Sequence, residues 1–205
     1  MLLEDLLAVR KENPKKLLRG VVHTAHWGAT PDMETDWVQS DKNYPFYAAL
    51  AFLVKPMSVL EIGVRLGYSL ISMFRGYDGI LKIVGVDLQA DVEDSQRKAR
   101  ENLVAVGYKK ELELPVVGSR WIKSFGSNVH FNLVHVDGDH SREGAREDIR
   151  MAWPKVAPGG ILVADDAEYA PGVKEGVEEI KPKLPGLGQN FYVDTFRGWW
   201  VAQKV

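Results

Sequence analysis

The sequence contains no cysteine, which excludes disulfide bonds, thiolate zinc sites, iron–sulfur clusters and a thiol nucleophile. Any bound metal must therefore be held by oxygen or imidazole ligands. A basic excess is also missing, because 26 Lys and Arg residues face 28 Asp and Glu residues and the formal net charge is −2. Proteins that bind nucleic acid through its phosphates need surplus positive charge. Nucleic acid is therefore not expected as a partner.

Long apolar segments are missing as well. The longest, Tyr47 to Val54, is far shorter than the roughly 20 residues that a membrane helix needs. The first residues carry acids at Glu4 and Asp5 and lack the basic start and unbroken apolar core of a signal peptide. We therefore expect a soluble, cytoplasmic protein with no membrane partner.

The pattern of hydrophobic residues predicts an α/β domain. Short β-branched segments alternate with longer segments of helical period, as in a parallel sheet joined by crossover helices. Five such segments are predicted to be strands: Ser58–Ile62, Ile83–Val86, Leu112–Val117, Phe131–Val136 and Ile161–Ala164. Three helical faces that could cover the sheet comprise Val92, Ala99, Leu103 and Val106, then Ala145, Ile149, Ala152 and Trp153, and finally Val173, Val177 and Ile180.

The last segments of the sequence do not follow this alternation of strands and helices. Phe191–Val193 and Trp199–Ala202 are separated by too few residues for a crossover helix, which predicts an antiparallel hairpin. We expect a Rossmann-like, doubly wound sheet of about seven mostly parallel strands, with helices on both faces. Residues 1–205 then form a single domain, in which 46–205 are the cofactor-binding core. Residues 1–45 hold an N-terminal helix and either a substrate lid or an irregular surface segment.

A glycine turn follows the first predicted strand. Gly63 and Gly67 lie four residues apart, where the backbone can approach a ligand closely and a following helix offers free N–H groups. A dinucleotide fingerprint needs three glycines in the pattern G-x-G-x-x-G, and the close first pair is missing here. Asp87 ends the second predicted strand, where an acid can accept both hydroxyls of a ribose or can cap a helix. These residues indicate an adenosine site without separating methyl transfer from hydride transfer.

Acidic residues follow two later strands. Asp137 comes after the fourth predicted strand, and Asp165 and Asp166 come after the fifth. If these strands are neighbours, roughly 4.8 Å apart, three carboxylates converge beside the cofactor. Such an all-oxygen cluster suits Mg²⁺ or another hard divalent ion, although each Asp alone could simply cap a strand or helix end. Asp139 is left outside this predicted set.

Histidine is the side chain best suited to accept a proton near neutral pH. His140 follows Asp137 by three residues and is therefore the candidate base. The other four histidines have no comparable neighbours in the sequence. Among them, His135 lies inside the fourth predicted strand and is expected to be a core or sheet-face residue.

Together these segments resemble class I S-adenosylmethionine (SAM)-dependent methyltransferases and, within them, the small divalent-metal-dependent O-methyltransferases. The segment 60–69 looks like the first motif of the catechol-type enzymes, including the Tyr-Ser after the second glycine. The segments 136–144 and 158–166 look closer to the sugar O-methyltransferases of macrolide tailoring. The resemblance covers about residues 45–180, and the chain lacks the large additional domain of the macrolide enzymes.

By position, the resemblance implies a role for each of these residues. The amino-acid end of SAM is matched by Glu61, Gly63, Gly67 and Ser69, the ribose by Asp87, and the adenine edge by Gly118 and Ser119. The metal ligands are matched by Asp137, Asp165 and Asp166, and the general base by His140, which with Asp137 forms the implied catalytic pair.

The function predicted from the sequence is SAM- and Mg²⁺-dependent methyl transfer to a hydroxyl of a small molecule, namely a sugar, a diol or a catechol-like compound. Three alternatives stay open: an NAD(P)-dependent oxidoreductase, a metal-dependent hydrolase, and a non-catalytic protein that binds an adenosine cofactor. The Trp-rich C-terminal strands could also pair with a second chain to form a homo-oligomer.

Overall fold

The computed structural model describes residues 43–88, 94–193 and 197–205. The strands are β1 (Ser58–Ile62), β2 (Lys82–Val86), β3 (Glu111–Glu113), β4 (Phe131–Val136), β5 (Val156–Ala164), β6 (Leu187–Val193) and β7 (Trp199–Lys204). The α-helices are α4 (Asn43–Val54), α5 (Tyr68–Gly76), α6 (Ser95–Ala105), α7 (Arg142–Ala152) and α8 (Pro171–Ile180). The described residues also contain three short 3-10 helices: η1 (Ser119–Ser124), η2 (Trp153–Lys155) and η3 (Lys181–Lys183).

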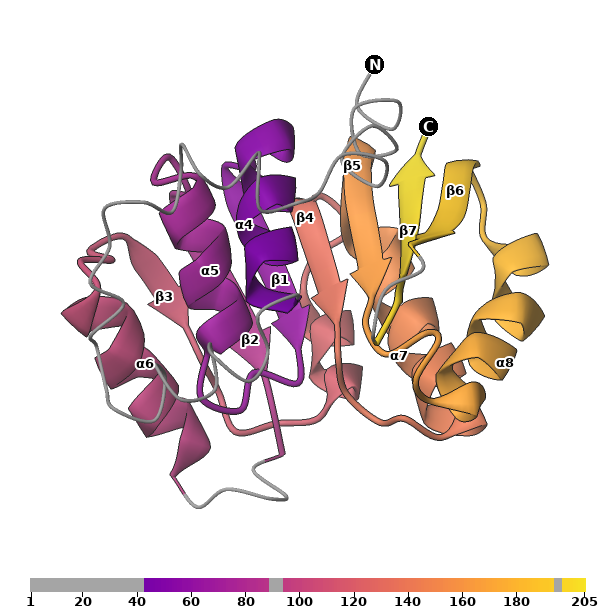
Figure 1. Ribbon diagram of the computed structural model, residues 1–205, viewed down its shortest axis with the longest axis horizontal. Coiled ribbons are helices and arrows are strands. Elements are labelled where there is room, and N and C mark those ends of the chain that lie inside the picture. The colour runs from indigo at the N-terminus through magenta and orange to yellow at the C-terminus, as the bar shows by residue number, and fades with distance from the viewer. Residues whose placement is uncertain (1–42, 89–93, 194–196) are drawn as a thin grey trace.

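The seven strands form one sheet in the order β3, β2, β1, β4, β5, β7, β6 (Figure 1). Strands β1 to β5 run parallel to one another, whereas β7 is antiparallel to both β5 and β6. The predicted fold class, including the closing antiparallel hairpin, is confirmed.

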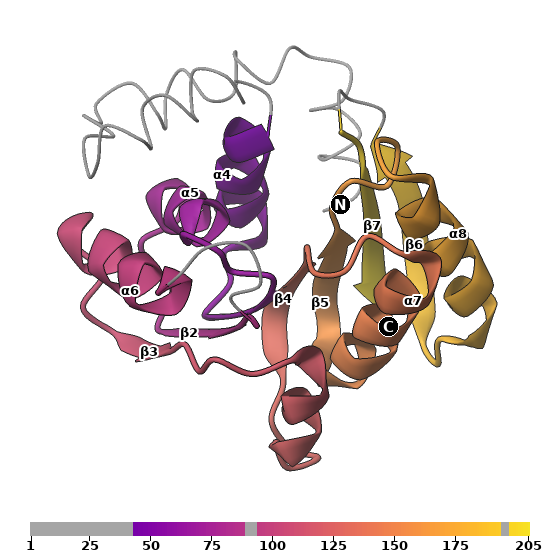
Figure 2. The ribbon, with the colours of Figure 1, turned by 90° about the horizontal axis from the view of Figure 1, so that it is seen from below.

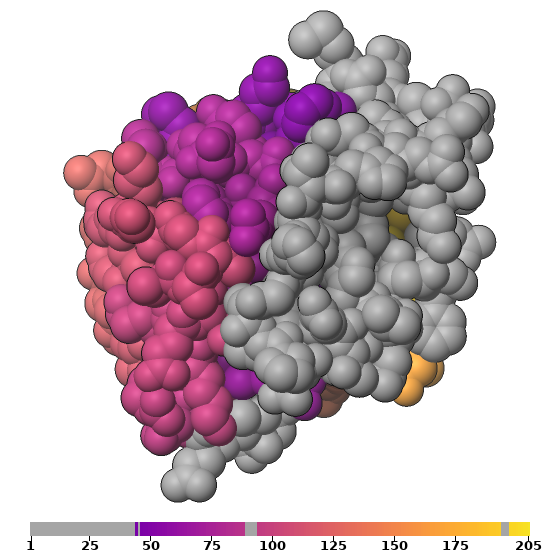
Figure 3. Space-filling view, turned by 60° about the vertical axis from the view of Figure 1, so that its left-hand side comes forward, coloured from indigo at the N-terminus to yellow at the C-terminus, as the bar shows by residue number. Residues whose placement is uncertain are grey.

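Two layers of helices cover the sheet. Helices α4, α5 and α6 lie on one face, and η1, α7 and α8 lie on the other (Figure 2). Most residues of β1 and β4 are buried on both faces of the sheet, which explains why these two strands lack polar alternation. Two hydrophobic clusters result, one under each layer, with Leu70 and Ile71 in the first and Ile149 and Val177 in the second. The outer surface of the first layer, coloured purple to pink, is seen in Figure 3.

The order in which strands are added to the sheet reverses at its centre. From β1 the chain steps outward to β2 and β3, then returns to β4 on the other side of β1 and steps outward to β5. Ligands of open α/β sheets bind in the crevice at the carboxyl ends of the strands beside such a reversal. The predicted site residues follow those strand ends, so this topology brings them to one edge of the sheet.

Some expectations need correction or stay outside the described residues. The third strand is shorter than predicted and ends at Glu113, because Pro115 has no N–H to donate to a ladder. Trp199 and Trp200 are buried within the chain, while β6 forms the edge of the sheet beside them, so pairing of the C-terminal strands with a second chain stays a prediction. The proposed N-terminal helix and lid fall almost wholly within residues 1–42, which lie outside the described residues. None of the described helices has the length and apolar character needed to cross a membrane.

Candidate active site

The glycine turn lies between β1 and α5 and adopts the backbone conformation that favours glycine. Gly63 has φ 87° and Gly67 has φ 77°. A Cβ on Gly63 would lie 1.8 Å from the main-chain oxygen of Asp137, so the turn after β1 packs directly on the turn after β4. A Cβ on Gly67 would lie 3.2 Å from Cβ of Ala99 in α6. Gly67 is therefore required by its positive φ and by helix packing, in addition to the predicted close approach to a ligand.

Glu61 is fully buried in β1 and faces the layer that holds α4 and α5. Its Oε1 accepts a hydrogen bond from the Ser69 hydroxyl, as expected for two residues of one predicted subsite, and lies 2.6 Å from Nδ1 of His135. Its Oε2 is buried and has no hydrogen-bond partner among the described residues. Burial raises the pKa of Glu61, while its contacts with His135 and Ser69 oppose the rise. The carboxylate thus retains one oxygen for a ligand.

The predicted ribose residue lies beside this turn, and the predicted adenine residues follow β3. The Asp87 carboxylate accepts a 2.7 Å hydrogen bond from the backbone N–H of Arg65 in the glycine turn, and Asp87 also bridges to Val116. Gly118 precedes η1, and a Cβ there would lie 3.5 Å from the side chain of Leu88. Ser119 begins η1. The structure therefore brings these residues to the ends of β2 and β3.

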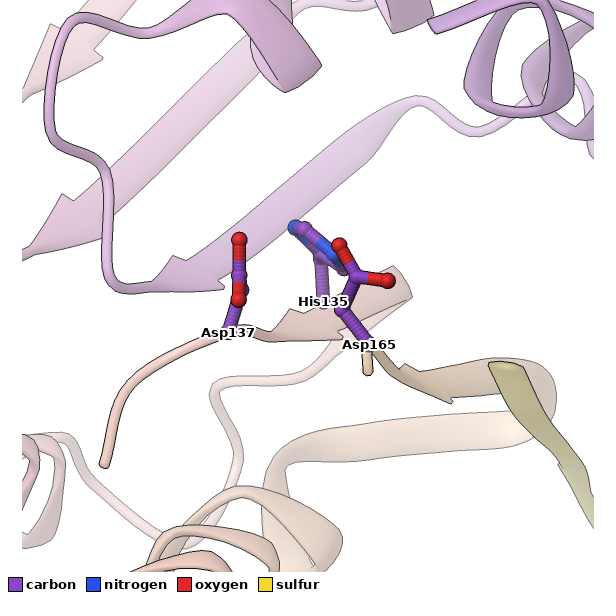
Figure 4. A group of neighbouring side chains, drawn as sticks. All are labelled: His135, Asp137 and Asp165. Carbon is purple, nitrogen blue, oxygen red and sulfur yellow. The ribbon is translucent and has the colours of Figure 1, made fainter. Parts of the chain in front are cut away.

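The three predicted metal ligands meet around Asp137, but not as one cluster. His135, Asp137 and Asp165 each offer one donor atom, all within 4.8 Å of one another, and so do Asp137, His140 and Asp166. Figure 4 shows the first group, in which the side chains of His135 and Asp165 point to the same side of the sheet. Asp165 belongs to the first group and Asp166, which has φ 57°, to the second. Asp137 is thus the residue shared by two donor groups.

Burial and mutual repulsion shape the charge of these acids. Burial, followed by the negative charge of Asp137, raises the pKa of Asp165 to about 7. The same two causes raise the pKa of Asp166, against the positive charge of Arg197. A carboxyl that resists ionisation next to other carboxylates is stabilised by a nearby cation.

His140 lies where the sequence places it, between two of the acids. Its Nε2 is 3.3 Å from Asp137 Oδ1 and 3.4 Å from Asp166 Oδ2, and its side chain is 43% exposed. The loop is held by Asp139, which accepts from the backbone N–H of Ser141, and by the Ser141 hydroxyl, which caps α7. The hydrogen bond with Asp137 is the main reason why the pKa of His140 is raised.

Sequence reasoning missed Tyr47 and the neighbours of His135. The Tyr47 hydroxyl donates to Asp165 Oδ2 at 2.5 Å, lies 3.1 Å from Nε2 of His135, and accepts from the indole N–H of Trp199 at 3.1 Å. His135 is buried, as expected, but the expectation that it lacks comparable neighbours is wrong. A signal was present, because residues 135 and 137 of one strand point to the same face.

Arg197 was missed as well. Its Nε lies 2.6 Å from Asp166 Oδ1 and one of its terminal nitrogens donates to Asp166 Oδ2 at 2.9 Å. The guanidinium also lies over the ring of Tyr169, 5.4 Å from its centroid. Arg197 follows β6 by sequence and reaches the acids because β7 pairs with β5, which local patterns do not reveal. Asp166 therefore already has one cationic partner.

A doubly wound sheet with this glycine turn, an acid after β2 and acids after β4 and β5 defines a class I methyltransferase. The comparison with family sequence profiles agrees: a family described as a methyltransferase domain matches residues 60–167, more than half of the 205-residue chain. The chain belongs to this family. The sequence motifs left both methyl transfer and hydride transfer open, and membership of this family decides for methyl transfer.

Solved structures show the same fold at low sequence identity. The O-methyltransferase from Bacillus cereus in complex with SAH has a TM-score of 0.69 and 16% identity over 93% of this chain and 96% of that one. The O-methyltransferase TomG from Streptomyces achromogenes, involved in tomaymycin synthesis and solved with SAM, has a TM-score of 0.64 and 18% identity over 86% and 89%. The SAH-bound methyltransferase PaMTH1 from Podospora anserina has a TM-score of 0.65 and 17% identity over 88% and 86%. No curated protein sequence matches the chain significantly.

Proposed function

We propose that this protein transfers a methyl group from SAM to a hydroxyl oxygen of a small molecule, with the help of a divalent cation, most suitably Mg²⁺. The observation that carries the proposal is the contact between Gly63 and the main chain of Asp137. It joins the glycine turn of a cofactor site to the acids of a cation site, as methyl transfer to an activated hydroxyl requires. The solved structures with SAM or SAH bound support the cofactor, since they share this fold.

The described residues fit the cofactor. The buried Oε2 of Glu61 lacks a hydrogen-bond partner among them and would accept from the ammonium group of SAM. The first N–H groups of α5 follow Gly67 without a side-chain cap and would bind the carboxylate. Asp87 would accept from the ribose hydroxyls, and Gly118 and Ser119 would lie against the adenine. Each part of SAM thus meets a group of complementary chemistry.

The described residues also fit a hard divalent cation. Asp137 and Asp165 would provide carboxylate oxygens, which Mg²⁺ prefers, and Asp166 would provide a third from the other side of Asp137. The raised pKa of Asp165 fits this assignment, because burial and the charge of Asp137 oppose its ionisation and a cation beside both carboxylates would favour it. Arg197 shares Asp166, so Asp137 and Asp165 carry most of the proposed binding.

His140 is the proposed base. A divalent cation beside the acids would lower the pKa of an acceptor hydroxyl and fix its orientation. His140, in its neutral form, would accept the hydroxyl proton at Nε2, the nitrogen that faces Asp137 and Asp166. The acceptor oxygen then attacks the methyl carbon, and the bond between that carbon and the sulfonium sulfur breaks. The remaining task of the protein is to align these atoms at about 3 Å separation.

A vicinal diol or a catechol-like compound is the proposed acceptor class, since two adjacent hydroxyls would chelate the cation best. The test is isothermal titration calorimetry with SAM, SAH and NAD in parallel, where SAM and SAH should bind at micromolar affinity and NAD should not. Methyl transfer to catechol or to an aliphatic vicinal diol should then stop on chelation and return on adding Mg²⁺. Binding of NAD but not of SAM would overturn the cofactor assignment, and undiminished transfer in excess chelator would overturn the cation assignment.

Substitution of Asp137 should separate the two halves of the site. Asp137→Asn should weaken Mn²⁺ binding about 10-fold or more, because it removes the carboxylate shared by both donor groups, while SAH affinity changes little. Asp139→Asn is the matched control, because Asp139 lies two residues further on and belongs to neither donor group. Equal Mn²⁺ affinity in the two variants would contradict the cation assignment.

A further inference from the structure

A continuous line of buried polar side chains connects the proposed cofactor and cation halves of the site. It runs from Glu61 through His135 and Tyr47 to Asp165, with separations of 2.6, 3.1 and 2.5 Å between successive polar atoms. These residues come from four separate elements or their ends, namely β1, β4, α4 and the end of β5. All four residues are buried to 5% exposure or less. We call these four residues the buried chain.

The direction of each hydrogen bond follows from the protons available. The indole of Trp199 can only donate, and the one phenol proton of Tyr47 is given to Asp165. The contact between His135 Nε2 and the phenol oxygen therefore uses a ring N–H as donor, and Nδ1 faces a carboxylate and donates as well. Each member of the buried chain is thus fixed by its neighbours on both sides.

The positions of the two end carboxylates depend on the middle of the chain. His135 contacts Glu61 directly, and residues 61 and 135 are register partners in the pairing of β1 with β4. Asp165 lies beyond a strand end, and its Oδ2 is held by Tyr47. Tyr47 in turn is anchored by Trp199, whose ring stacks on Phe46 of α4 at 3.9 Å between centroids. Consecutive hydrogen bonds link the four residues, and removing one member of such a buried polar network loosens the others.

We propose that His135 and Tyr47 are positioning residues that hold the Glu61 and Asp165 carboxylates in one fixed mutual arrangement, so that the cofactor half and the cation half of the site depend on each other. The inference rests on the proposed function, because it takes Glu61 as a ligand of SAM and Asp165 as a ligand of the cation. In this role both residues act through the two carboxylates that they hold. Groups that orient metal ligands in this way typically change metal affinity 10- to 100-fold when they are removed.

The test uses the single oxygen that distinguishes Tyr from Phe. Tyr47→Phe keeps the ring and its contacts but removes the hydrogen bonds with His135, Asp165 and Trp199. Mn²⁺ affinity, measured from the electron paramagnetic resonance signal of the free ion, should fall about 10- to 100-fold. SAH affinity, measured by calorimetry without cation, should fall about fivefold or more, although His135 separates Tyr47 from Glu61 in the cofactor half.

Tyr108→Phe is the matched control. Tyr108 is equally buried, and its hydroxyl donates to the main-chain oxygen of Glu111 at 2.9 Å, near the β3 edge of the sheet. Its loss should lower the melting temperature and leave both affinities unchanged. If the wild-type protein binds SAH and Mn²⁺ and Tyr47→Phe binds both equally well, the positioning role is wrong and the proposed function stands. If the wild-type protein fails to bind either ligand, the proposed function and the inference both fail.

A measurement on the unaltered protein keeps the inference testable if Tyr47→Phe does not fold. The ring nitrogens of His135 lie between the two halves and can be followed by ¹H–¹⁵N nuclear magnetic resonance. Addition of SAH alone should shift these signals, and addition of Mg²⁺ alone should shift them too. Signals that respond to one ligand only, or to neither, would overturn the proposed dependence between the halves.

Discussion

The α-carbon of Gly63 lies so close to the main-chain oxygen of Asp137 that a Cβ would stand 1.8 Å from it. This approach joins the ends of β1 and β4 at the centre of the sheet, where the backbone N–H of Asp137 also donates to Ile62 at 2.8 Å. The distance between the glycine turn and the acids is therefore set by the main chain, and side chains refine it.

Gly63→Ala should destabilise the protein by more than about 4 kcal/mol, a loss reserved for severe steric or buried-charge defects. Gly159→Ala is the matched control, because Gly159 also has a positive φ but a Cβ there would meet nothing within 4 Å. It should cost only about 1 to 2 kcal/mol for the left-handed backbone. Urea unfolding gives the free energy of unfolding of both variants. Similar losses of stability in the two would show that the contact with Asp137 relaxes easily.

Asp87→Ala should weaken SAH binding about 10- to 100-fold, since hydrogen bonds to a charged group are worth about 1.5 to 3 kcal/mol. Asp94→Ala is the control, because Asp94 is an exposed acid that pairs with Arg97 at the start of α6. Calorimetry should show wild-type affinity for that control. A folded Asp87→Ala variant with unchanged SAH affinity would disprove the ribose assignment.

His140→Ala should lower methyl transfer to an aliphatic vicinal diol about 10²- to 10⁴-fold, the usual contribution of a positioned base. The hydrogen bond with Asp137 raises the pKa of His140, so wild-type activity should rise with pH above the ordinary histidine range near 6.5. His130→Ala, at an exposed histidine before β4, should keep wild-type activity and pH profile. Near-normal turnover by His140→Ala with the same profile would reduce His140 to a loop residue.

His135 should make stability depend on alkaline pH. Burial disfavours its charged ring, but the hydrogen bond and charge of Glu61, together with the charges of Asp137 and Asp165, outweigh burial and raise its pKa to about 9. A raised folded-state pKa contributes stability that is complete below about 6.5 and is lost as pH rises through about 9. In urea unfolding from pH 6.5 to 9.5, the difference in free energy of unfolding between the wild-type protein and His135→Phe should become smaller. A constant difference would mean that the ring is neutral throughout.

Local patterns in the sequence predicted most of the fold. Strands covered on both faces read as continuous apolar segments, so Ser58–Ile62 and Phe131–Val136 were predicted with the bounds that the structure has. The predicted Leu112–Val117 failed because Pro115 interrupts pairing at the edge of the sheet, where a segment can remain extended without a ladder. Hydrophobic periodicity indicates which residues are buried, but it does not indicate which backbone groups form hydrogen bonds with a neighbouring strand.

The arrangement of the candidate site was predictable only where a residue follows a strand end. Asp137, Asp165 and His140 could be placed from their own segments, because parallel strands bring their carboxyl ends to one edge. Tyr47 could not, since it lies 118 residues from Asp165 in the sequence and belongs to an apolar helix. The division of Asp165 and Asp166 between two donor groups was also hidden, because the sequence does not show where two adjacent side chains point.

Helix α4 has a practical consequence for anyone who shortens the chain. The family profile begins at residue 60, within β1, and a fragment cut at that boundary would keep every carboxylate of the site. It would nevertheless lose the phenol that holds Asp165 and the ring that stacks on Trp199. We expect such a fragment to carry the recognisable motifs of a methyltransferase while lacking the helix that packs against the candidate site, so a shortened chain should retain α4.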